Sequence, residues 1–225
     1  MEEIKEVLRL ENVNFSYGAN HVLQDVSFSF KSGKIYAVTG KSGAGKTTLL
    51  SVISGLADPS SGEVFCNGQN LKEMDKYEYR SKSIGVIFQS FNLLTKLTAA
   101  ENVELSMDIA GIDCEDKKQR AYDILAQVGL SRDEADRRVL KLSGGQQQRV
   151  AIARALSYDP DIIMADEPTG NLDEETQDEI MDILEGLASQ GKCVIIVTHS
   201  SSVAARADEK IVLYKDNPAI RDSVR

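Results

Sequence analysis

The stretch Gly40-Lys-Ser-Gly-Ala-Gly-Lys-Thr47 decides the fold class of this chain. It matches the pattern GxxxxGK(S/T) in full, and it stands between the apolar run KIYAVT (34–39) and a segment with helical spacing. Glycines allow consecutive backbone N–H groups to turn inward around phosphate oxygens, and the following helix adds the positive end of its dipole. The stretch therefore predicts a P-loop that holds nucleotide phosphates in an α/β fold. A purely structural glycine turn is the alternative, which motif and context together disfavour.

Two side chains of this loop have specific expected roles. We expect the Lys46 ammonium to reach the β- and γ-phosphates, and the Thr47 hydroxyl to ligate Mg²⁺. The same loop is expected to contact the nucleotide through Gly40, Lys41, Ser42, Gly43, Ala44, Gly45 and Thr48.

The string IIMADEP (162–168) supplies a second candidate site. An apolar strand that ends in Asp166 places a carboxylate at the carboxyl edge of a sheet, where ligands collect in open α/β folds. We expect Asp166 to bind Mg²⁺ and the adjacent Glu167 to polarise the attacking water. A solvated loop or a structural ion pair is the alternative, but a P-loop in the same chain favours the catalytic interpretation.

A third segment, Leu142-Ser-Gly-Gly-Gln146, opens the helical stretch QQQRVAIARAL. Ser143 is a good N-cap, and Gly144 and Gly145 expose N–H groups at a helix N-terminus, which is a second anion site. A glycine-rich helix cap is the alternative. One nucleotide in a monomer does not need two phosphate sites far apart in the sequence.

The remaining pattern predicts the fold. Val26, Phe28 and Phe30 alternate with serines, as in a half-buried antiparallel strand, and GEVFCNGQ (62–69) reads as another strand with its turn. Apolar runs typical of a largely parallel sheet, buried on both faces, follow at 84–88, 161–166, 193–198 and 210–214. Residues 90–158 have helical spacing. We expect an α/β core with a small antiparallel sheet at its start and a helical insertion.

Several helical faces can be assigned from spacing alone. After the P-loop, one face is expected to carry Leu49, Leu50, Ile53 and Leu56. A face in the insertion groups Ala121, Ile124, Leu125 and Val128. The buried stripe of the segment EETQDEIMDILEGLASQG (174–191) is expected at Ile180, Ile183, Leu184 and Leu187, with Gly191 as the helix stop.

Composition narrows the class of protein. The 225 residues suit one domain, and the net charge of −9 argues against a general nucleic-acid binder. Cys66, Cys114 and Cys193 are widely spaced and suggest free thiols, with neither a zinc site nor a disulfide framework. No apolar stretch approaches the roughly 20 residues that span a bilayer. We therefore expect any membrane role to come through a partner.

The string LSGGQ followed by QQR, together with the P-loop and DEP, resembles the nucleotide-binding subunit of an ABC transporter, from about Val7 to Val212. The resemblance implies a P-loop NTPase (RecA-like) core with an N-terminal antiparallel β-subdomain and an inserted α-helical subdomain. Residues 1–225 would form a single domain, with 89–158 as the helical subdomain and 1–88 plus 159–225 as the rest. ATP and Mg²⁺ are the implied ligands.

The same resemblance implies roles for further residues. Tyr17 corresponds to an aromatic residue that stacks on adenine, although it can also be read as an ordinary strand aromatic. Gln89 corresponds to a glutamine that contacts Mg²⁺ and water, and His199 to a histidine that contacts the γ-phosphate. His199 on its own would read as a core histidine. Asp173, in Asn171-Leu-Asp173, belongs to a loop that crosses between subunits, and Ser143, Gly144, Gly145 and Gln146 would bind the partner's ATP.

The resemblance also implies an assembly. Two copies would stack head to tail around ATP, and its hydrolysis would drive an integral-membrane permease, which holds the chain on the cytoplasmic face of the cell membrane. The strings FQSFNLLTKLTAAENV and DEPTGNLD resemble the subgroup that serves lipoprotein release, macrolide or peptide export, bacitracin-type resistance and cell division. The alternatives are a soluble ABC ATPase acting on DNA or ribosomes, and a module that holds ATP without hydrolysis.

Overall fold

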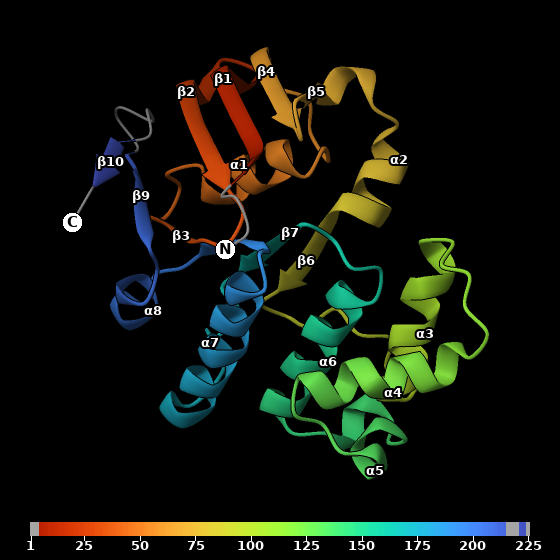
Figure 1. The fold of residues 1–225 in the computed structure, drawn as a ribbon. Coiled ribbons are helices and arrows are strands. Elements are labelled where there is room, and N and C mark those ends of the chain that lie inside the picture. Colours follow the sequence, from red (N-terminus) through yellow and green to blue (C-terminus); the bar gives the residue numbers. More distant parts are fainter. Residues whose placement is uncertain (1–4, 215–220, 224–225) are drawn as a thin grey trace.

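The computed structural model describes residues 5–214 and 221–223. Within them the chain forms a four-stranded sheet of order β2-β1-β4-β5 and a six-stranded sheet of order β10-β9-β3-β8-β7-β6. Figure 1 shows the four-stranded sheet at the top, helices α3 to α6 at the lower right, strands β3, β6 and β7 of the larger sheet in the middle, and β9 and β10 at the left. This arrangement confirms the predicted fold class.

The smaller sheet is antiparallel and comes from the alternating segments near the N-terminus. Its strands are β1 (Glu6–Tyr17), β2 (Asn20–Lys31), β4 (Ser61–Cys66) and β5 (Gln69–Asn70). In β2, Val26 and Phe30 are buried while Ser27 is exposed, as the alternation predicts. Asn67 and Gly68 join β4 to β5 with positive φ at both positions, the conformation that an Asn-Gly hairpin turn requires.

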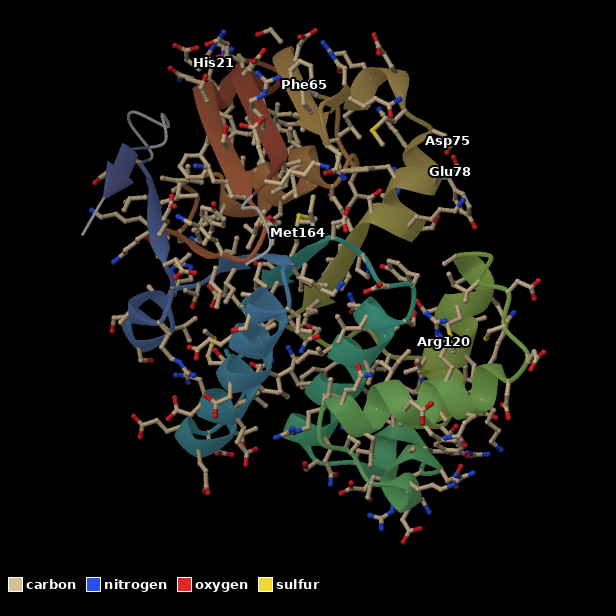
Figure 2. All side chains as sticks on the ribbon, viewed as in Figure 1. His21, Phe65, Asp75, Glu78, Arg120 and Met164 are labelled. Carbon is tan, nitrogen blue, oxygen red and sulfur yellow. The ribbon has the colours of Figure 1, made fainter. Side chains whose placement is uncertain are left out.

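The larger sheet carries the apolar runs. Its strands β3 (Ile35–Gly40), β6 (Ile84–Phe88), β7 (Ile162–Asp166), β8 (Cys193–Val197) and β9 (Glu209–Leu213) pair in parallel, and β10 (Arg221–Ser223) pairs antiparallel with β9. Ile195 of β8 enters the core shared with the antiparallel sheet and α1, while Ile196 enters the core shared with the helices. Met164 of β7 lies near the centre of the molecule (Figure 2). Burial on both faces explains why these strands read as continuous apolar runs.

Helices surround this sheet. Helix α1 (Lys46–Ile53) follows the P-loop, and α2 (Lys76–Glu78) continues into a π-helical turn. Helices α3 (Ala99–Ile109), α4 (Lys117–Gln127), α5 (Arg132–Ala135) and α6 (Gly144–Leu156) lie between β6 and β7 in the chain. Helices α7 (Glu174–Ser189) and α8 (Ser201–Ala205) follow β7 and β8. The subdomain boundaries at residues 89 and 158 stay a prediction.

The predicted helical faces are confirmed except at one residue. The stripe on α7 is buried at Ile180, Leu184 and Leu187 and half-buried at Ile183, and Gly191 follows with a φ of 92°. The expectation for Leu56 was wrong: its side chain is 64% exposed. Helix α1 ends at Ile53, and Gly55 turns the chain with a φ of 68°, so Leu56 leaves the buried face.

The structure bears on two further expectations. The three cysteines are free, two of them buried. Across residues 5–214 and 221–223, none of the helices combines the length and apolarity needed to traverse a bilayer.

Candidate functional site

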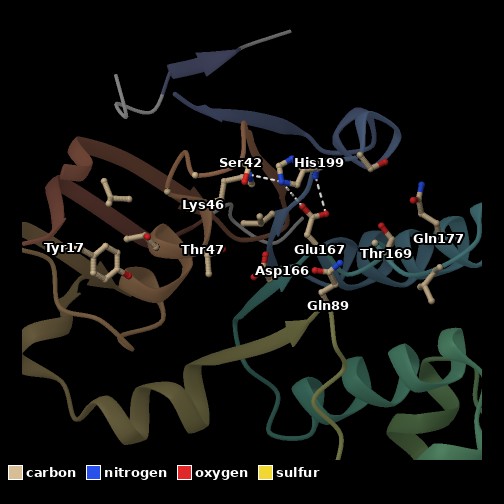
Figure 3. Close-up of a pocket in the computed structure, with 18 of the residues that line it drawn as sticks. Tyr17, Ser42, Lys46, Thr47, Gln89, Asp166, Glu167, Thr169, Gln177 and His199 are labelled. Carbon is tan, nitrogen blue, oxygen red and sulfur yellow. Dashed lines mark hydrogen bonds and ion pairs between the residues drawn. The ribbon is translucent and has the colours of Figure 1, made fainter. Parts of the chain in front are cut away.

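A pocket of about 810 Å³ opens at the carboxyl ends of the parallel strands (Figure 3). Asp166 at the end of β7 lies between Phe88 of β6 and Val197 of β8 in the register of the sheet. Because β3 is the other neighbour of β8, the P-loop that follows β3 meets the same edge. The pairing of the strands therefore brings together segments about 160 residues apart, at the place where open α/β sheets bind ligands.

Backbone geometry in the P-loop requires glycine at two positions. Gly40 has a φ of 149°, and a Cβ there would lie 2.5 Å from the Leu213 carbonyl oxygen. Gly45 has a φ of 94°, and a Cβ there would lie 3.0 Å from Cγ1 of Val22. Gly45 is also the N-cap of α1 and supplies no side-chain cap, so the N-terminal N–H groups of this helix are available to an anion.

The Lys46 side chain lies inside this loop and is only 7% exposed. Its Nζ donates to the Gly40 carbonyl oxygen at 2.9 Å and lies 3.1 Å from Nε2 of His199. Burial lowers the pKa of Lys46, and the nearby carboxylates of Glu167 and Asp166 oppose that shift. The ammonium is thus held at the rim of the pocket by groups that a phosphate oxygen can replace.

Asp166 and Glu167 form an acidic pair near this lysine, and the backbone of Glu167 is strained. Burial raises the pKa of Asp166, with a further contribution from the charge of Glu167. Glu167 adopts a φ of 48°, a left-handed conformation that is costly for a residue with a side chain. Its backbone N–H donates to the Val197 carbonyl oxygen at 2.9 Å, which ties this conformation to the sheet.

The Glu167 carboxylate is oriented toward His199. Its Oε2 accepts a hydrogen bond from the His199 backbone N–H at 3.3 Å, and its Oε1 lies 3.7 Å from Nε2 of the same residue. Oε1 is buried and has no hydrogen-bond partner within the described part of the chain. A buried carboxylate oxygen with a free lone pair, beside a basic side chain, is suited to accept a proton from water.

Three side chains at the pocket could hold a metal ion. Thr47, Gln89 and Asp166 all line it and offer a hydroxyl, an amide and a carboxylate oxygen. Residues 5–214 and 221–223 contain no group of three or more His, Cys, Asp or Glu side chains arranged to hold a metal. This sparse oxygen set fits Mg²⁺, which proteins usually bind through few side chains together with substrate phosphates and water. The assignment stays a prediction.

Tyr17 stands at the outer end of the pocket. Its side chain is 61% exposed and meets Phe15 edge-on, with 4.9 Å between ring centroids. An exposed ring supported from one edge offers a free face for stacking. The adenine contact stays a prediction.

The glycine-rich start of α6 does not reach this pocket. None of Ser143, Gly144, Gly145 and Gln146 lines it. Ser143 caps α6 as expected: its Oγ accepts from the Gln146 N–H at 3.3 Å, while the Gln146 side chain accepts from the Ser143 N–H at 2.8 Å. Asp173 likewise caps α7 and lies outside the pocket, and hydrogen bonds from Thr176 lower the pKa of its carboxyl. The predicted second anion site therefore lies apart from this pocket in a single chain.

The pocket also contains residues that motif reading did not assign, and some expected ones are absent from its lining. Lys41 and Ala44 do not line it, and Gly40 contributes only the carbonyl that holds Lys46. Thr169 and Gly170 line it and follow the DEP string directly, so that string could have indicated them. Leu172 belongs to the string DEPTGNLD, and Val197 and Ser200 lie within two residues of His199, so these positions also had a signal nearby. Asn20, Val22 and Gln177 line the pocket without any such signal.

Comparison with known proteins identifies relatives of this chain. Residues 23–170 match the family described as ABC transporter. An uncharacterized ABC transporter ATP-binding protein of Bacillus subtilis, YclH, is 40% identical over 97% of this chain and 98% of its own length. The macrolide export ATP-binding/permease protein MacB 2 of Yersinia pestis is 42% identical over 98% of this chain. The chain spans only 33% of the length of that MacB protein.

Solved structures show the same fold. The bacterial ABC transporter cassette MJ0796, solved as a dimer, superposes with a TM-score of 0.86 at 37% identity, covering 96% of this chain and 98% of that one. A second dimeric structure of MJ0796, in a post-hydrolysis state bound to ADP and Pi, matches equally well.

Proposed function

This chain belongs to the ABC transporter family as one of its ATP-binding proteins, and from that premise we propose that it hydrolyses MgATP in the pocket of Figure 3 to drive a membrane permease. The observation that carries the proposal is the position of Glu167. Its Oε1 is buried and has no hydrogen-bond partner among the described residues. This oxygen lies beside His199, whose Nε2 is 3.1 Å from Lys46 Nζ. A proton acceptor and a phosphate-binding cation are thus adjacent.

Each residue of the site has a separate proposed role in hydrolysis. The P-loop N–H groups and Lys46 would bind the β- and γ-phosphates, with the ammonium exchanging its contact with Gly40 for phosphate oxygens. Glu167 would accept a proton from the attacking water. His199, which lies beside both Glu167 and Lys46, would contact the γ-phosphate. The bound Mg²⁺, held by Thr47, Asp166 and Gln89, would offset negative charge that develops on the phosphates.

A second copy would complete the site. Ser143 to Gln146 form an anion site that the chain's own pocket does not use. Head-to-tail stacking would place this segment of one copy on the nucleotide of the other, so that ATP joins the two. The dimeric MJ0796 cassettes support pairing of this kind of chain.

A second cavity offers a docking place for the permease. It measures about 390 Å³ and lies between the end of α1, strand β6 and helices α3 and α6. Leu56, the apolar residue left exposed beyond α1, lines it together with Arg80, Phe88, Ser106, Arg154 and Tyr158. The MacB relative is described as both ATP-binding protein and permease, which supports a permease partner and a place on the inner face of the cell membrane. We propose the export or force-transmitting subgroup on the same grounds.

The hydrolysis proposal is tested with the variant Glu167→Gln. Because this change keeps the shape of the side chain but removes the proton acceptor, it should retain ATP binding and lose nearly all turnover. The variant should also elute as a dimer in ATP during size-exclusion chromatography. Turnover at the wild-type rate would remove Glu167 from the mechanism.

The permease proposal is tested by co-purification. A tagged chain recovered from detergent-solubilised membranes should bring down a membrane permease, and Leu56→Asp should weaken that recovery without changing ATP hydrolysis. Recovery with ribosomes or DNA would instead favour the soluble class of ABC ATPases.

A further inference from the structure

A hydrogen bond connects helix α6, which carries Ser143 to Gln146 at its start, directly to the loop that carries Glu167. The side chain of Gln148, in the second turn of α6, is fully buried. Its Nε2 donates to the Pro168 carbonyl oxygen at 2.7 Å. Pro168 immediately follows Glu167, so the amide of Gln148 reaches the Pro168–Thr169 peptide unit, one residue beyond the proposed proton acceptor.

This contact completes the support of a strained segment. Glu167 has a positive φ, which is costly for a residue with a side chain. The proline that follows it restricts its backbone further. The Glu167 N–H is held by the Val197 carbonyl on β8, and its carbonyl accepts from the Gly170 N–H at 3.1 Å. Gln148 supplies the anchor on the far side of Pro168. One anchor belongs to the sheet and the other to α6, so the orientation of Glu167 depends on where α6 lies.

Gln148 is poorly explained as a residue that stabilises the fold. Its Oε1 is buried and has no hydrogen-bond partner within the described residues. Since the Pro168 carbonyl can only accept, the nitrogen must face it and the oxygen must face the unpartnered side. An unpaired buried acceptor opposes folding and offsets what the single hydrogen bond contributes. The contact with Pro168 is therefore the feature of this side chain that needs a functional explanation.

We propose that Gln148 is a positioning residue that sets the Glu167 carboxylate according to the position of α6. The inference rests on the proposed function, in which the start of α6 binds the nucleotide of the partner copy. A helix transmits displacement along its axis, and Gln148 lies within two turns of Ser143. The nucleotide bound by one copy would thus affect, through α6 and the Pro168 peptide, the proton acceptor that serves the other nucleotide.

The test is the variant Gln148→Met, which has similar volume but no amide. Misplacement of a catalytic group should lower kcat by about tenfold or more. The KM for ATP and ATP-dependent dimerisation should stay within twofold of wild type. The variant removes the unpaired Gln148 Oε1 but leaves the Pro168 carbonyl oxygen without a donor, so the net loss is about one hydrogen bond. Tm should therefore fall by no more than roughly 4 °C.

Asn102→Leu is the matched control. Asn102 is a buried amide of α3 that also bonds to backbone groups, but its partners belong to Leu94 and Thr98 and its oxygen is satisfied. This variant should lower Tm while retaining kcat at temperatures where it is folded. The two amides should therefore show opposite patterns of stability and turnover.

The outcomes separate the alternatives. A Gln148→Met protein with kcat within twofold of wild type would overturn the proposal, as would one that loses kcat and Tm together. Gln148→Leu is the second variant, and failure of both to fold would assign the amide to stability and also overturn it. A wild-type chain without ATP hydrolysis would refute the proposed function instead. If the wild type is active and Glu167→Gln is inactive, the proposed function holds, and the Gln148 variants then test the positioning role alone.

Discussion

The side chains of Lys46 and His199 meet at 3.1 Å, Nζ to Nε2, although 153 positions separate them in the sequence. Lys46 comes from the P-loop and His199 from the segment that follows β8, so the contact joins two distant elements that line the pocket. The Glu167 carboxylate completes the group, with Oε1 3.7 Å from the same His199 nitrogen. A cation, an imidazole and a carboxylate are thus adjacent, an arrangement that suits phosphoryl transfer to water.

Replacement of Lys46 by alanine should weaken ATP binding. The lysine is expected to exchange the Gly40 carbonyl for charged phosphate oxygens, and hydrogen bonds to charged groups contribute about 2 kcal/mol, or roughly thirtyfold in Kd. Titration with a fluorescent ATP analogue measures this change. Unchanged affinity would contradict the P-loop assignment.

Replacement of His199 by alanine should separate binding from turnover. The imidazole lies beside both Lys46 and Glu167, so its loss should reduce kcat by about a hundredfold while the P-loop still binds ATP. Steady-state kinetics should show KM within a few-fold of wild type. An equal loss in binding would mean that His199 acts mainly by holding Lys46.

Asp166→Asn should stabilise the free protein at neutral pH while it removes activity. Burial and the charge of Glu167 raise the pKa of Asp166, so the folded chain holds this proton more tightly than the unfolded chain. The charged form therefore opposes folding above the folded-state pKa, and this penalty disappears as the pH falls toward the unfolded value. We expect a Tm increase of roughly 2–4 °C at pH 7.5, for about 1 kcal/mol. The increase should shrink as the pH falls through 4 and vanish near pH 3, below the unfolded-state pKa.

Thermal unfolding across pH, without nucleotide, provides the measurement. A Tm for Asp166→Asn equal to or below that of wild type at pH 7.5 would show that the charged Asp166 carboxylate does not destabilise the folded protein. Persistence of the full difference at pH 3 would assign it to something other than the charge of Asp166.

Gly145→Ala should destabilise the junction of α6 and α7. A Cβ at this position would lie 2.5 Å from Cγ2 of Thr176, so either the Thr176 side chain must rotate away from its hydrogen bond with Asp173 or one of the two helices must shift. We expect a loss of about 1–3 kcal/mol, the usual cost of overpacking. Thr176→Ser removes that methyl group and keeps the hydroxyl that bonds to Asp173. The double variant should therefore recover most of the lost Tm, and a double variant as unstable as Gly145→Ala would refute the steric explanation.

The fold was predictable because its signals are local. The alternation from Val26 to Phe30 indicates a strand buried on one face, and the continuous apolar run of β8 indicates a strand buried on both faces. Ser143 caps its helix through the backbone of the next turn, so this role depends only on neighbouring residues. Leu56 was misplaced because helical spacing continues through Gly55, whereas the backbone does not. The chemistry of the motifs likewise suggested which residues line the pocket.

The local pattern around each segment does not indicate its contacts with distant segments. The family resemblance implied that Lys46 and His199 share the γ-phosphate, but nothing in the sequence indicates that they contact each other directly. Likewise, a third glutamine in a run of three gives no indication that it reaches Pro168. Asn20 and Val22 reach the pocket because β2 belongs to the smaller sheet, which packs over the P-loop through Val22 and Gly45. Such relationships follow from strand order and helix packing, which are properties of the whole chain.

If one chain carries halves of two different ATP sites, two variants that each disable a different half should restore ATP hydrolysis when they are mixed. Lys46→Ala disables the P-loop half, and Ser143→Asp keeps a good N-cap on α6 while its charge repels phosphate. Each variant should be inactive alone. When the two are mixed with Mg²⁺ and ATP, head-to-tail pairing creates one site with an intact P-loop and an intact Ser143 segment, and ATP hydrolysis should reappear. A mixture no more active than its components would contradict the composite site.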